Sequence, residues 1–248
     1  MSVKFEFNNI DEENIIEKVD LSGESGDEVD IGEVDLDKDK IALFAEKREL
    51  EDDQYHDYSE PYLQFTLAPQ NLNVLTKLTS LLQKEEEWGE DRYDWHDSKG
   101  KEYKDYRYVD VLGLCEDEDS DIYELIKNLF ELSNDDNFNY DLDENSIEVH
   151  LLRYKEGGQY NWHSDYGVSK NSKRGMTRKL SMSIQLSEES DYEGGELEWI
   201  DYSARHSYLP KFKGAGVVFD SRLPHKANTL KSGERLVLIA WASGPQLR

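Results

Sequence analysis

The chain has 248 residues and carries 29 lysines and arginines against 55 aspartates and glutamates, a formal net charge of −26 at pH 7. Such a charge repels phosphate backbones, so it excludes the electrostatic attraction that supplies most nucleic-acid binding, and we expect no nucleic-acid partner. The length suffices for one sizeable domain with an extension.

The cysteine count and the hydropathy pattern limit the cellular location. Cys115 is the single cysteine, so no internal disulfide can form. The first residues contain no apolar segment of the kind found in secretory signals. The chain also lacks a run of about 18 or more apolar residues, so we expect no membrane-spanning helix. These features predict a reducing, cytoplasmic location without a membrane partner.

The first sixty residues differ from the rest in amino-acid composition. Residues 1–60 form an acidic N-terminal extension that is poor in aromatic side chains, and we expect it to be partly disordered or docked on the domain that follows. Within it, residues 29–36 alternate between apolar and acidic side chains and predict one edge strand. We assign residues 61–248 to a single folded domain.

The first part of this domain mixes helices with strands. Tyr62, Phe65 and Leu67 indicate a strand, and apolar residues at helical spacing predict a helix over 71–86. A second strand is predicted over 106–114. A second helix is predicted over 121–133, capped at its start by the residues around Asp121. Charged residues predict an ordered loop over 85–105 and an acidic loop over 134–144.

From residue 146 onward, short alternating runs are separated by turn residues. Eight such runs indicate a β-sandwich or a small barrel, with the helices packed on one outside face. The predicted strands cover residues 147–154, 159–166, 179–187, 195–201, 206–212, 216–220, 224–229 and 235–242.

His163 and Asp165, followed at a distance by His225, make a candidate metal site. Two imidazoles and one carboxylate are the ligands of mononuclear non-haem Fe(II) centres that keep coordination positions open. Side chains at positions i and i+2 of a strand point to the same face, so one strand could present both His163 and Asp165. A distant strand would then add His225.

The sequence around these residues resembles the 2-oxoglutarate/Fe(II)-dependent dioxygenases, in particular their prolyl-hydroxylase-like, PKHD-type branch. The resemblance covers roughly residues 147–245, and more loosely 61–146. Its motifs are Tyr154-x-x-Gly157-Gly158, His163-x-Asp165, the run from Arg178 to Ser187 (RKLSMSIQLS), Tyr192-x-Gly-Gly-Glu-Leu197, and His225 followed by Gly233-x-Arg235.

The resemblance implies a mainly β fold with flanking helices, whose core at about 146–245 is a double-stranded β-helix (jelly roll, cupin-like). It implies Fe(II) held by His163, Asp165 and His225, with 2-oxoglutarate and O2 as co-substrates and ascorbate in support. It implies hydroxylation of a C–H bond, most directly in a prolyl residue of a protein or peptide. An intact Asp165 favours hydroxylation over halogenation, because the related halogenases lack this carboxylate.

Four further residues are expected to bind the co-substrate. The guanidinium of Arg235 can hold a carboxylate through two parallel hydrogen bonds, and the resemblance places Gln185 near the same carboxylate. Tyr154 and Tyr160 are expected to donate from their phenols or to pack at the rim of the pocket. Trp241 shares a strand face with Arg235, and we expect it to serve in core packing.

Two other features leave alternatives open. The segment 166–178 is basic in an otherwise acidic chain, and it could be a lid over the substrate or a solvated loop. The histidines outside the motif are assigned structural roles, with His150 on a wall or at the surface; they are His56, His96, His150 and His206.

The resemblance leaves the substrate open. The leading alternatives are a hydroxylase of a free amino acid or small metabolite and a non-catalytic jelly-roll binding module. A Zn(II) or Mn(II) cupin is disfavoured because cupins use His-x-His with a following glutamate. A nucleic-acid demethylase is disfavoured by the acidic charge. The sequence does not specify the oligomeric state.

Overall fold

The computed structural model describes residues 61–68, 71, 74, 88–167 and 175–246. The predicted extension 1–60 with its edge strand and His56, most of the predicted helix 71–86, and the centre of the basic segment 166–178 lie outside the described residues.

Strands dominate the described part of the chain. One sheet has the order β1-β10-β6-β13-β4-β3-β5-β11-β8-β9, and β2 pairs with β3 beside this path. A separate pair joins β12 to β7. The strands are β1 (Tyr62–Thr66), β2 (Gly89–His96), β3 (Glu102–Gly113), β4 (Ile147–Tyr154), β5 (Gln159–His163), β6 (Met176–Gln185), β7 (Tyr192–Gly194), β8 (Leu197–Ile200), β9 (His206–Tyr208), β10 (Ala215–Asp220), β11 (His225–Ala227), β12 (Leu230–Gly233) and β13 (Arg235–Pro245).

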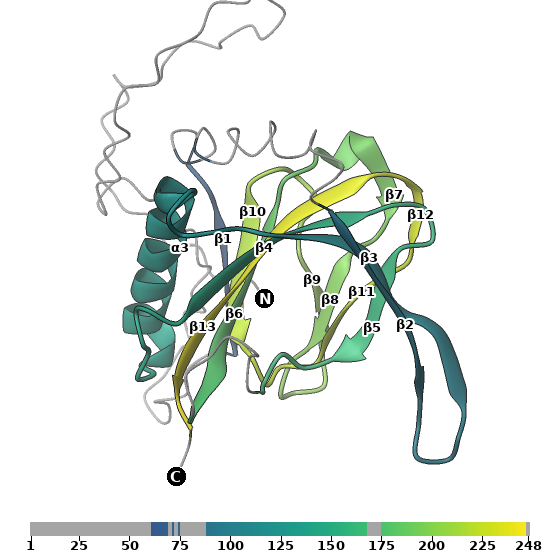
Figure 1. Ribbon diagram of the computed structural model, residues 1–248, viewed down its shortest axis with the longest axis horizontal. Helices are drawn as coiled ribbons and strands as arrows, with labels where there is room; N and C mark the ends of the chain where they lie inside the picture. Colours follow the sequence, from purple (N-terminus) through teal and green to yellow (C-terminus); the bar gives the residue numbers. More distant parts are fainter. Residues whose placement is uncertain (1–60, 69–70, 72–73, 75–87, 168–174, 247–248) are drawn as a thin grey trace, which may run out of the picture.

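The large sheet curls so that its two ends face each other across an interior (Figure 1). The long strand β3 makes the bend, because its last residues pair with β4 while Arg107 and Tyr108 pair with β5. All pairings are antiparallel. This mainly β architecture confirms the predicted fold class, and the strand runs predicted from residue 146 onward each overlap a strand of the structure.

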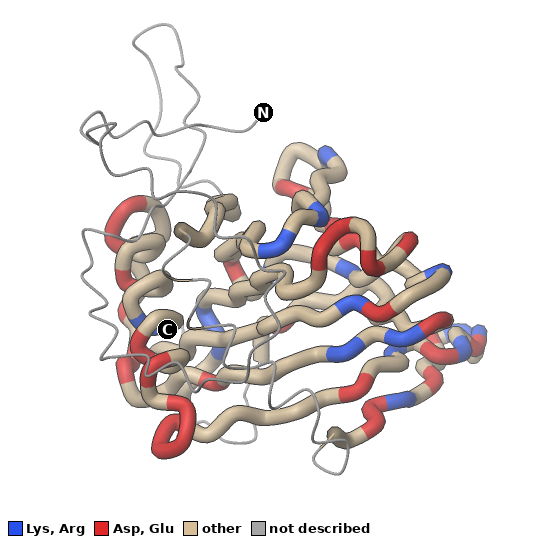
Figure 2. The backbone as a smooth tube through the Cα atoms, turned by 90° about the horizontal axis from the view of Figure 1, so that it is seen from above, with Lys and Arg blue, Asp and Glu red and all other residues tan. Residues whose placement is uncertain are grey.

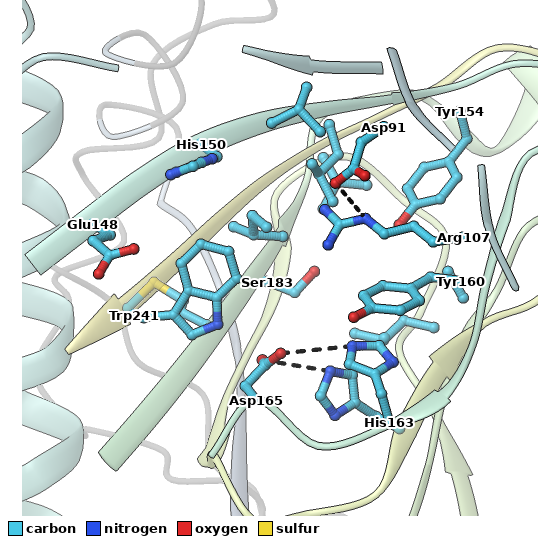
Figure 3. Close-up of a pocket in the computed structure, with 18 of the residues that line it drawn as sticks. Asp91, Arg107, Glu148, His150, Tyr154, Tyr160, His163, Asp165, Ser183 and Trp241 are labelled. Atoms are coloured by element: carbon cyan, nitrogen blue, oxygen red, sulfur yellow. Dashed lines mark ion pairs between the residues drawn. The ribbon is translucent and has the colours of Figure 1, made fainter. Parts of the chain in front are cut away.

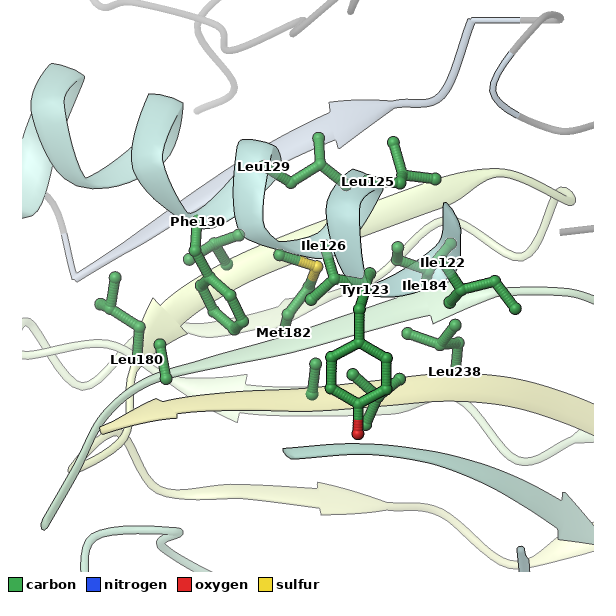
Figure 4. Close-up of a cluster of buried hydrophobic side chains, with 14 of the residues drawn as sticks. Ile122, Tyr123, Leu125, Ile126, Leu129, Phe130, Leu180, Met182, Ile184 and Leu238 are labelled. Carbon is green, nitrogen blue, oxygen red and sulfur yellow. The ribbon is translucent and has the colours of Figure 1, made fainter. Parts of the chain in front are cut away.

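One helix, α3 (Ser120–Ser133), covers the outer face of the sheet. Its apolar stripe fits the expected 3–4 spacing and meets the aliphatic side chains of β6 and β13 (Figure 4). Leu125, Ile126 and Leu129 have no exposed surface at all. Because the helix seals this outer face, the opposite, inward face of the same strands is left to line a cavity.

Several predicted boundaries differ from the structure. The helix start has Asp119, not Asp121, at its N-cap, and no side chain there makes a capping hydrogen bond. The acidic loop 134–144 opens with a five-residue π-helical turn, Asn134–Phe138. The short strands β7 and β12 were not predicted, because each has only three or four residues and contains glycine.

The predicted loop over 85–105 is wrong for its described part. Residues 89–105 belong to a long hairpin, β2–β3, that projects from the body of the protein (Figure 1). Figure 2 shows basic and acidic positions mixed at its end, whereas acidic positions dominate α3 and its surroundings. The hairpin carries no aliphatic stripe, and cross-strand pairs of aromatic rings hold it instead, among them Trp95 with Tyr103.

Within the described ranges, no helix combines the length and the apolar character that crossing a bilayer would require.

Candidate metal and co-substrate site

The three predicted metal ligands come together on the inner side of the curled sheet. His163 ends β5 and His225 begins β11, and these two residues are direct partners in the antiparallel register. The register therefore brings together two histidines that are distant in sequence. One donor atom from each histidine and one from Asp165 all lie within 4.8 Å of one another.

Both imidazoles present the same nitrogen to the carboxylate. The Nδ1 atom of His163 lies 2.7 Å from the carbonyl oxygen of Asn161, and that of His225 lies 2.9 Å from the carbonyl oxygen of Leu223. Each Nδ1 therefore donates a proton to a carbonyl, which leaves the Nε2 lone pair free for a metal. The Nε2 atoms lie 3.6 and 3.5 Å from the two oxygens of Asp165. This donor set fits Fe(II).

Asp165 reaches the site from a loop, which corrects the expectation that it shares a strand with His163. The strand β5 ends at His163. The backbone N–H groups of Asp165 and Tyr166 both donate to the carbonyl oxygen of Ser221 at 2.9 and 2.8 Å, which ties this loop to the end of β10. The carboxylate also accepts a hydrogen bond from the Ser181 hydroxyl at 2.8 Å and one from Trp241.

The charge states of the ligands suit a cation. Burial disfavours the charged form of Asp165, but its contacts with His225 and His163 and its hydrogen bonds from Trp241 and Ser181 hold the pKa of Asp165 below its usual value. The pKa of His163 is lowered from its ordinary value because of burial and the neighbouring His225. The site therefore offers a carboxylate at Asp165 and a neutral imidazole nitrogen at His163.

The ligands line a cavity of about 480 Å³ whose walls come from both halves of the sheet. Arg235 lines the same cavity and is 3% exposed. Its Nε donates to the Oε1 of Gln185 at 3.0 Å, and its side chain is also hydrogen-bonded to that of Tyr192. No carboxylate in the described part of the chain forms an ion pair with Arg235. A buried guanidinium without an acidic partner is costly unless an anion completes it, so this position fits the distal carboxylate of 2-oxoglutarate.

The other predicted co-substrate residues surround Arg235 and the ligands. Tyr154 lies opposite Arg235 in the β4–β13 register, and its ring centroid is 5.5 Å from the guanidinium carbon. The ring of Tyr160 stacks on that of His163 with centroids 3.4 Å apart. Burial raises the pKa of both phenols, so each is a neutral hydrogen-bond donor. Their roles toward 2-oxoglutarate stay predictions.

Sequence reasoning missed two pairs of charged residues that also line the cavity. Arg107 of β3 lies 3.1 Å from Asp91 of β2 (Figure 3). Asp91 falls in the stretch predicted to be a loop, whereas Arg107 falls in the strand predicted over 106–114. Elsewhere on the cavity wall, Arg178 pairs with Glu148 at 2.9 Å. The sequence offered no motif for the Asp91–Arg107 pair, since it depends on the hairpin register.

Trp241 lies at the cavity wall, so its predicted role in core packing is incomplete. Val237, Ile239 and Trp241 follow Arg235 along the inner face of β13, as the alternation predicts. The Trp241 indole contacts three groups: the Asp165 carboxylate, the guanidinium of Arg178 at 3.7 Å from its ring centroid, and the His150 ring with centroids 5.4 Å apart.

Among the described residues, the histidines outside the motif (His96, His150 and His206) are not part of the ligand cluster. His150 is a wall residue of the cavity, which agrees with the prediction, and burial lowers its pKa. His206 pairs through Nδ1 with Glu198 at 2.6 Å on the outer strands β8 and β9. His96 is exposed on the hairpin near Glu102.

Comparison with known proteins agrees with this geometry. Residues 149–243 match the model of the 2OG-Fe(II) oxygenase superfamily. A PKHD-type hydroxylase of Psychrobacter sp. is 36% identical over 90 residues, which is 36% of this chain. A PKHD-type hydroxylase of Picosynechococcus sp. is 36% identical over 97 residues, which is 38% of this chain. The chain covers only 34% and 42% of the lengths of those two relatives.

Two solved structures share the fold. A Pseudomonas putida prolyl-4-hydroxylase superposes with a TM-score of 0.55 at 20% identity, over 73% of this chain and 92% of that protein. A Trichoplax adhaerens prolyl hydroxylase, solved in complex with a peptide fragment of the hypoxia-inducible factor, gives a TM-score of 0.55 at 16% identity, over 74% of this chain and 83% of that protein. The segment 149–243 that matches the 2OG-Fe(II) oxygenase superfamily contains all three ligands and Arg235, so the part of the chain that is similar to this superfamily is the part that builds the site.

Proposed function

We propose that the protein is an Fe(II)- and 2-oxoglutarate-dependent dioxygenase that hydroxylates a C–H bond, most directly in a prolyl residue of a protein or peptide. The observation that carries the reaction class is that one cavity holds two histidines and one carboxylate as metal ligands, together with the buried Arg235, which has no acidic partner among the described residues. When bound, the metal and 2-oxoglutarate supply the oxidising chemistry, in which 2-oxoglutarate and O2 yield succinate, carbon dioxide and a hydroxylated product.

Different residues of the chain would bind the metal and orient the co-substrate. His163, Asp165 and His225 would hold Fe(II), and their fixed donor atoms leave other coordination positions open. Arg235, supported by Gln185, would hold the distal carboxylate of 2-oxoglutarate and so fix its orientation. The surrounding strands bury the site from solvent, which protects reactive species from water.

The peptide preference has weaker support than the reaction class. The two solved relatives with the same fold are prolyl hydroxylases, and one of them was solved with a peptide. The cavity wall beyond Arg235 is mostly aromatic and aliphatic, with Tyr160, Ile239 and Trp241, which suits an apolar ring such as that of proline. Hydroxylation of a free amino acid or small metabolite is the second candidate, since the Arg107–Asp91 pair at the cavity could bind its charged ends.

The direct test is turnover of 2-oxoglutarate with proline-containing peptides and with free proline in parallel. We expect succinate to form with a peptide, together with gain of one oxygen atom by that peptide, and neither product in Asp165→Ala. Turnover with free amino acids alone would support the metabolite hydroxylase. Absence of both metal binding and succinate would support a non-catalytic binding module.

A further inference from the structure

A series of aromatic rings leads from the metal site to the surface of the hairpin. Tyr160 is stacked on the ligand His163, with centroids 3.4 Å apart and an interplanar angle of 16°. The Tyr106 ring follows with its centroid 6.1 Å from that of Tyr160. Trp95 and Tyr93 then lie 5.5 and 5.9 Å from Tyr106.

The two ends of this series lie in different environments. Tyr160 lines the cavity, whereas Trp95 and Tyr93 are 43% and 40% exposed at the surface. Tyrosine and tryptophan are the side chains that lose a single electron most readily. Rings in such close contact allow electrons to move quickly between them, because tunnelling slows steeply with distance.

We infer that Tyr160, Tyr106 and Trp95 form an electron path that reduces the metal site when it becomes oxidised without a substrate to hydroxylate. The inference rests on the proposed function, since it needs a bound Fe(II) that reacts with O2 and 2-oxoglutarate. Oxidising equivalents left at the site without a substrate C–H bond would damage neighbouring side chains, and Tyr160, stacked on the ligand His163, is one of these neighbours. The path leaves the exposed Trp95 oxidised in place of the residues at the site, and a soluble reductant such as ascorbate can then reduce Trp95.

The net transfer involves one electron and one proton. Trp95 loses an electron, which passes through Tyr106 and Tyr160 to the oxidised metal, and its indole N–H proton goes to water. Each tyrosine is oxidised and then reduced again. When Tyr106 is oxidised, its phenol proton shifts along the hydrogen bond to the carbonyl oxygen of Trp162 and returns when the ring is reduced again. The proton of Tyr160 shifts and returns in the same way within its hydrogen bond to the Tyr93 phenol.

The test loads the protein with Fe(II) and exposes it to 2-oxoglutarate and O2 without a peptide. Succinate is measured, and oxygen addition to side chains is mapped by peptide mass spectrometry. We expect modification at Trp95 and Tyr93 in preference to Tyr202 and Tyr208, although these two are 66% and 51% exposed.

Variants of Tyr106 separate an electron path from simple packing. Tyr106→Phe keeps the ring but removes the oxidisable phenol, so Trp95 should lose most of its modification and Tyr160 should gain it. Tyr106→Trp, which is oxidisable, should restore modification at Trp95. Tyr103→Phe is the matched control, because Tyr103 packs on Trp95 at 5.3 Å outside the path, and it should leave the pattern unchanged.

Two results would overturn the path. Modification that follows exposure, with Tyr202 and Tyr208 oxidised as much as Trp95, would show that a diffusing oxidant is responsible. A modification pattern in Tyr106→Phe equal to that of the unaltered protein would show that electrons do not pass through Tyr106. Either result together with succinate formation contradicts the path alone, whereas absence of both succinate and metal binding contradicts the proposed function.

Discussion

Asp165 is the residue on which the site's electrostatics depend. It faces both imidazole Nε2 atoms and is itself held by Ser181 and Trp241. These outer hydrogen bonds fix the direction of the carboxylate before a metal arrives, and such bonds contribute strongly to metal affinity.

Ser181→Ala should therefore weaken Fe(II) binding by about 10- to 100-fold, because the Asp165 carboxylate loses one of its donors. Calorimetric titration of the metal-free protein with Fe(II) under anaerobic conditions measures this. Ser183→Ala is the matched control, since Ser183 lies two residues along the same strand face, lines the cavity and has no contact with Asp165. Equal losses in both variants would contradict the role of Ser181.

Arg235 is the residue that decides co-substrate affinity. Arg235→Ala should raise the dissociation constant of 2-oxoglutarate by about 10- to 150-fold, since a charged hydrogen-bonded contact of about 1.5–3 kcal/mol is lost. Binding of 2-oxoglutarate to the Fe(II)-loaded protein measures it. Arg205→Ala, which removes an arginine paired with Asp201 away from the cavity, should leave the affinity unchanged. Unchanged affinity in Arg235→Ala would refute its assignment as the anchor.

At the level of elements, α3 stabilises the half of the sheet that carries Arg235. Its buried face packs on β6 and β13, whose other faces line the cavity. Leu125→Ala should lower the free energy of unfolding by about 2–5 kcal/mol, because a fully buried side chain leaves a cavity. Urea unfolding measures the loss. Glu124→Ala, exposed on the same helix, should change it by no more than about 0.5 kcal/mol.

The elements also show why part of the fold was predictable. Aliphatic alternation marked β4, β6 and β13, because one face of each strand packs in the core with α3 and the other face lines the cavity. The hairpin has no such stripe. Its Tyr103 and Tyr106 both contact Trp95 although they are three residues apart, which a regular strand forbids. Asp105, with a φ of 46°, interrupts the strand between them and makes this possible.

The site residues likewise divide into those that the sequence predicts and those that depend on tertiary contacts. The His163 and His225 positions followed from the motif, and the register of β5 with β11 explains their proximity. The loop position of Asp165 could not be predicted, because it depends on hydrogen bonds to Ser221, a residue distant in sequence. Likewise, Arg107 reaches the cavity only through tertiary pairing of β3 with β5.

At the level of the whole molecule, the buried metal site makes stability depend on pH. His163 has a lowered pKa in the folded, metal-free protein and an ordinary value near 6.5 when unfolded. Below pH 6.5 the unfolded chain therefore binds a proton that the folded protein does not, so stability falls as pH decreases.

The free energy of unfolding of the metal-free protein should accordingly decrease below pH 6.5, and His163→Gln should reduce this slope because glutamine does not titrate. Denaturant unfolding across this range measures both slopes. His96→Gln is the control, since His96 is exposed on the hairpin. Identical pH slopes in His163→Gln and the unaltered protein would contradict the buried neutral imidazole.

The central claim is that one cavity holds Fe(II) and 2-oxoglutarate together. The most direct measurement is an anaerobic titration of the metal-free protein with Fe(II) and 2-oxoglutarate, followed by visible absorption. The account predicts a weak charge-transfer band that requires both additions and is absent in His225→Ala. A protein that binds neither Fe(II) nor 2-oxoglutarate, or a band that persists in His225→Ala, would contradict it.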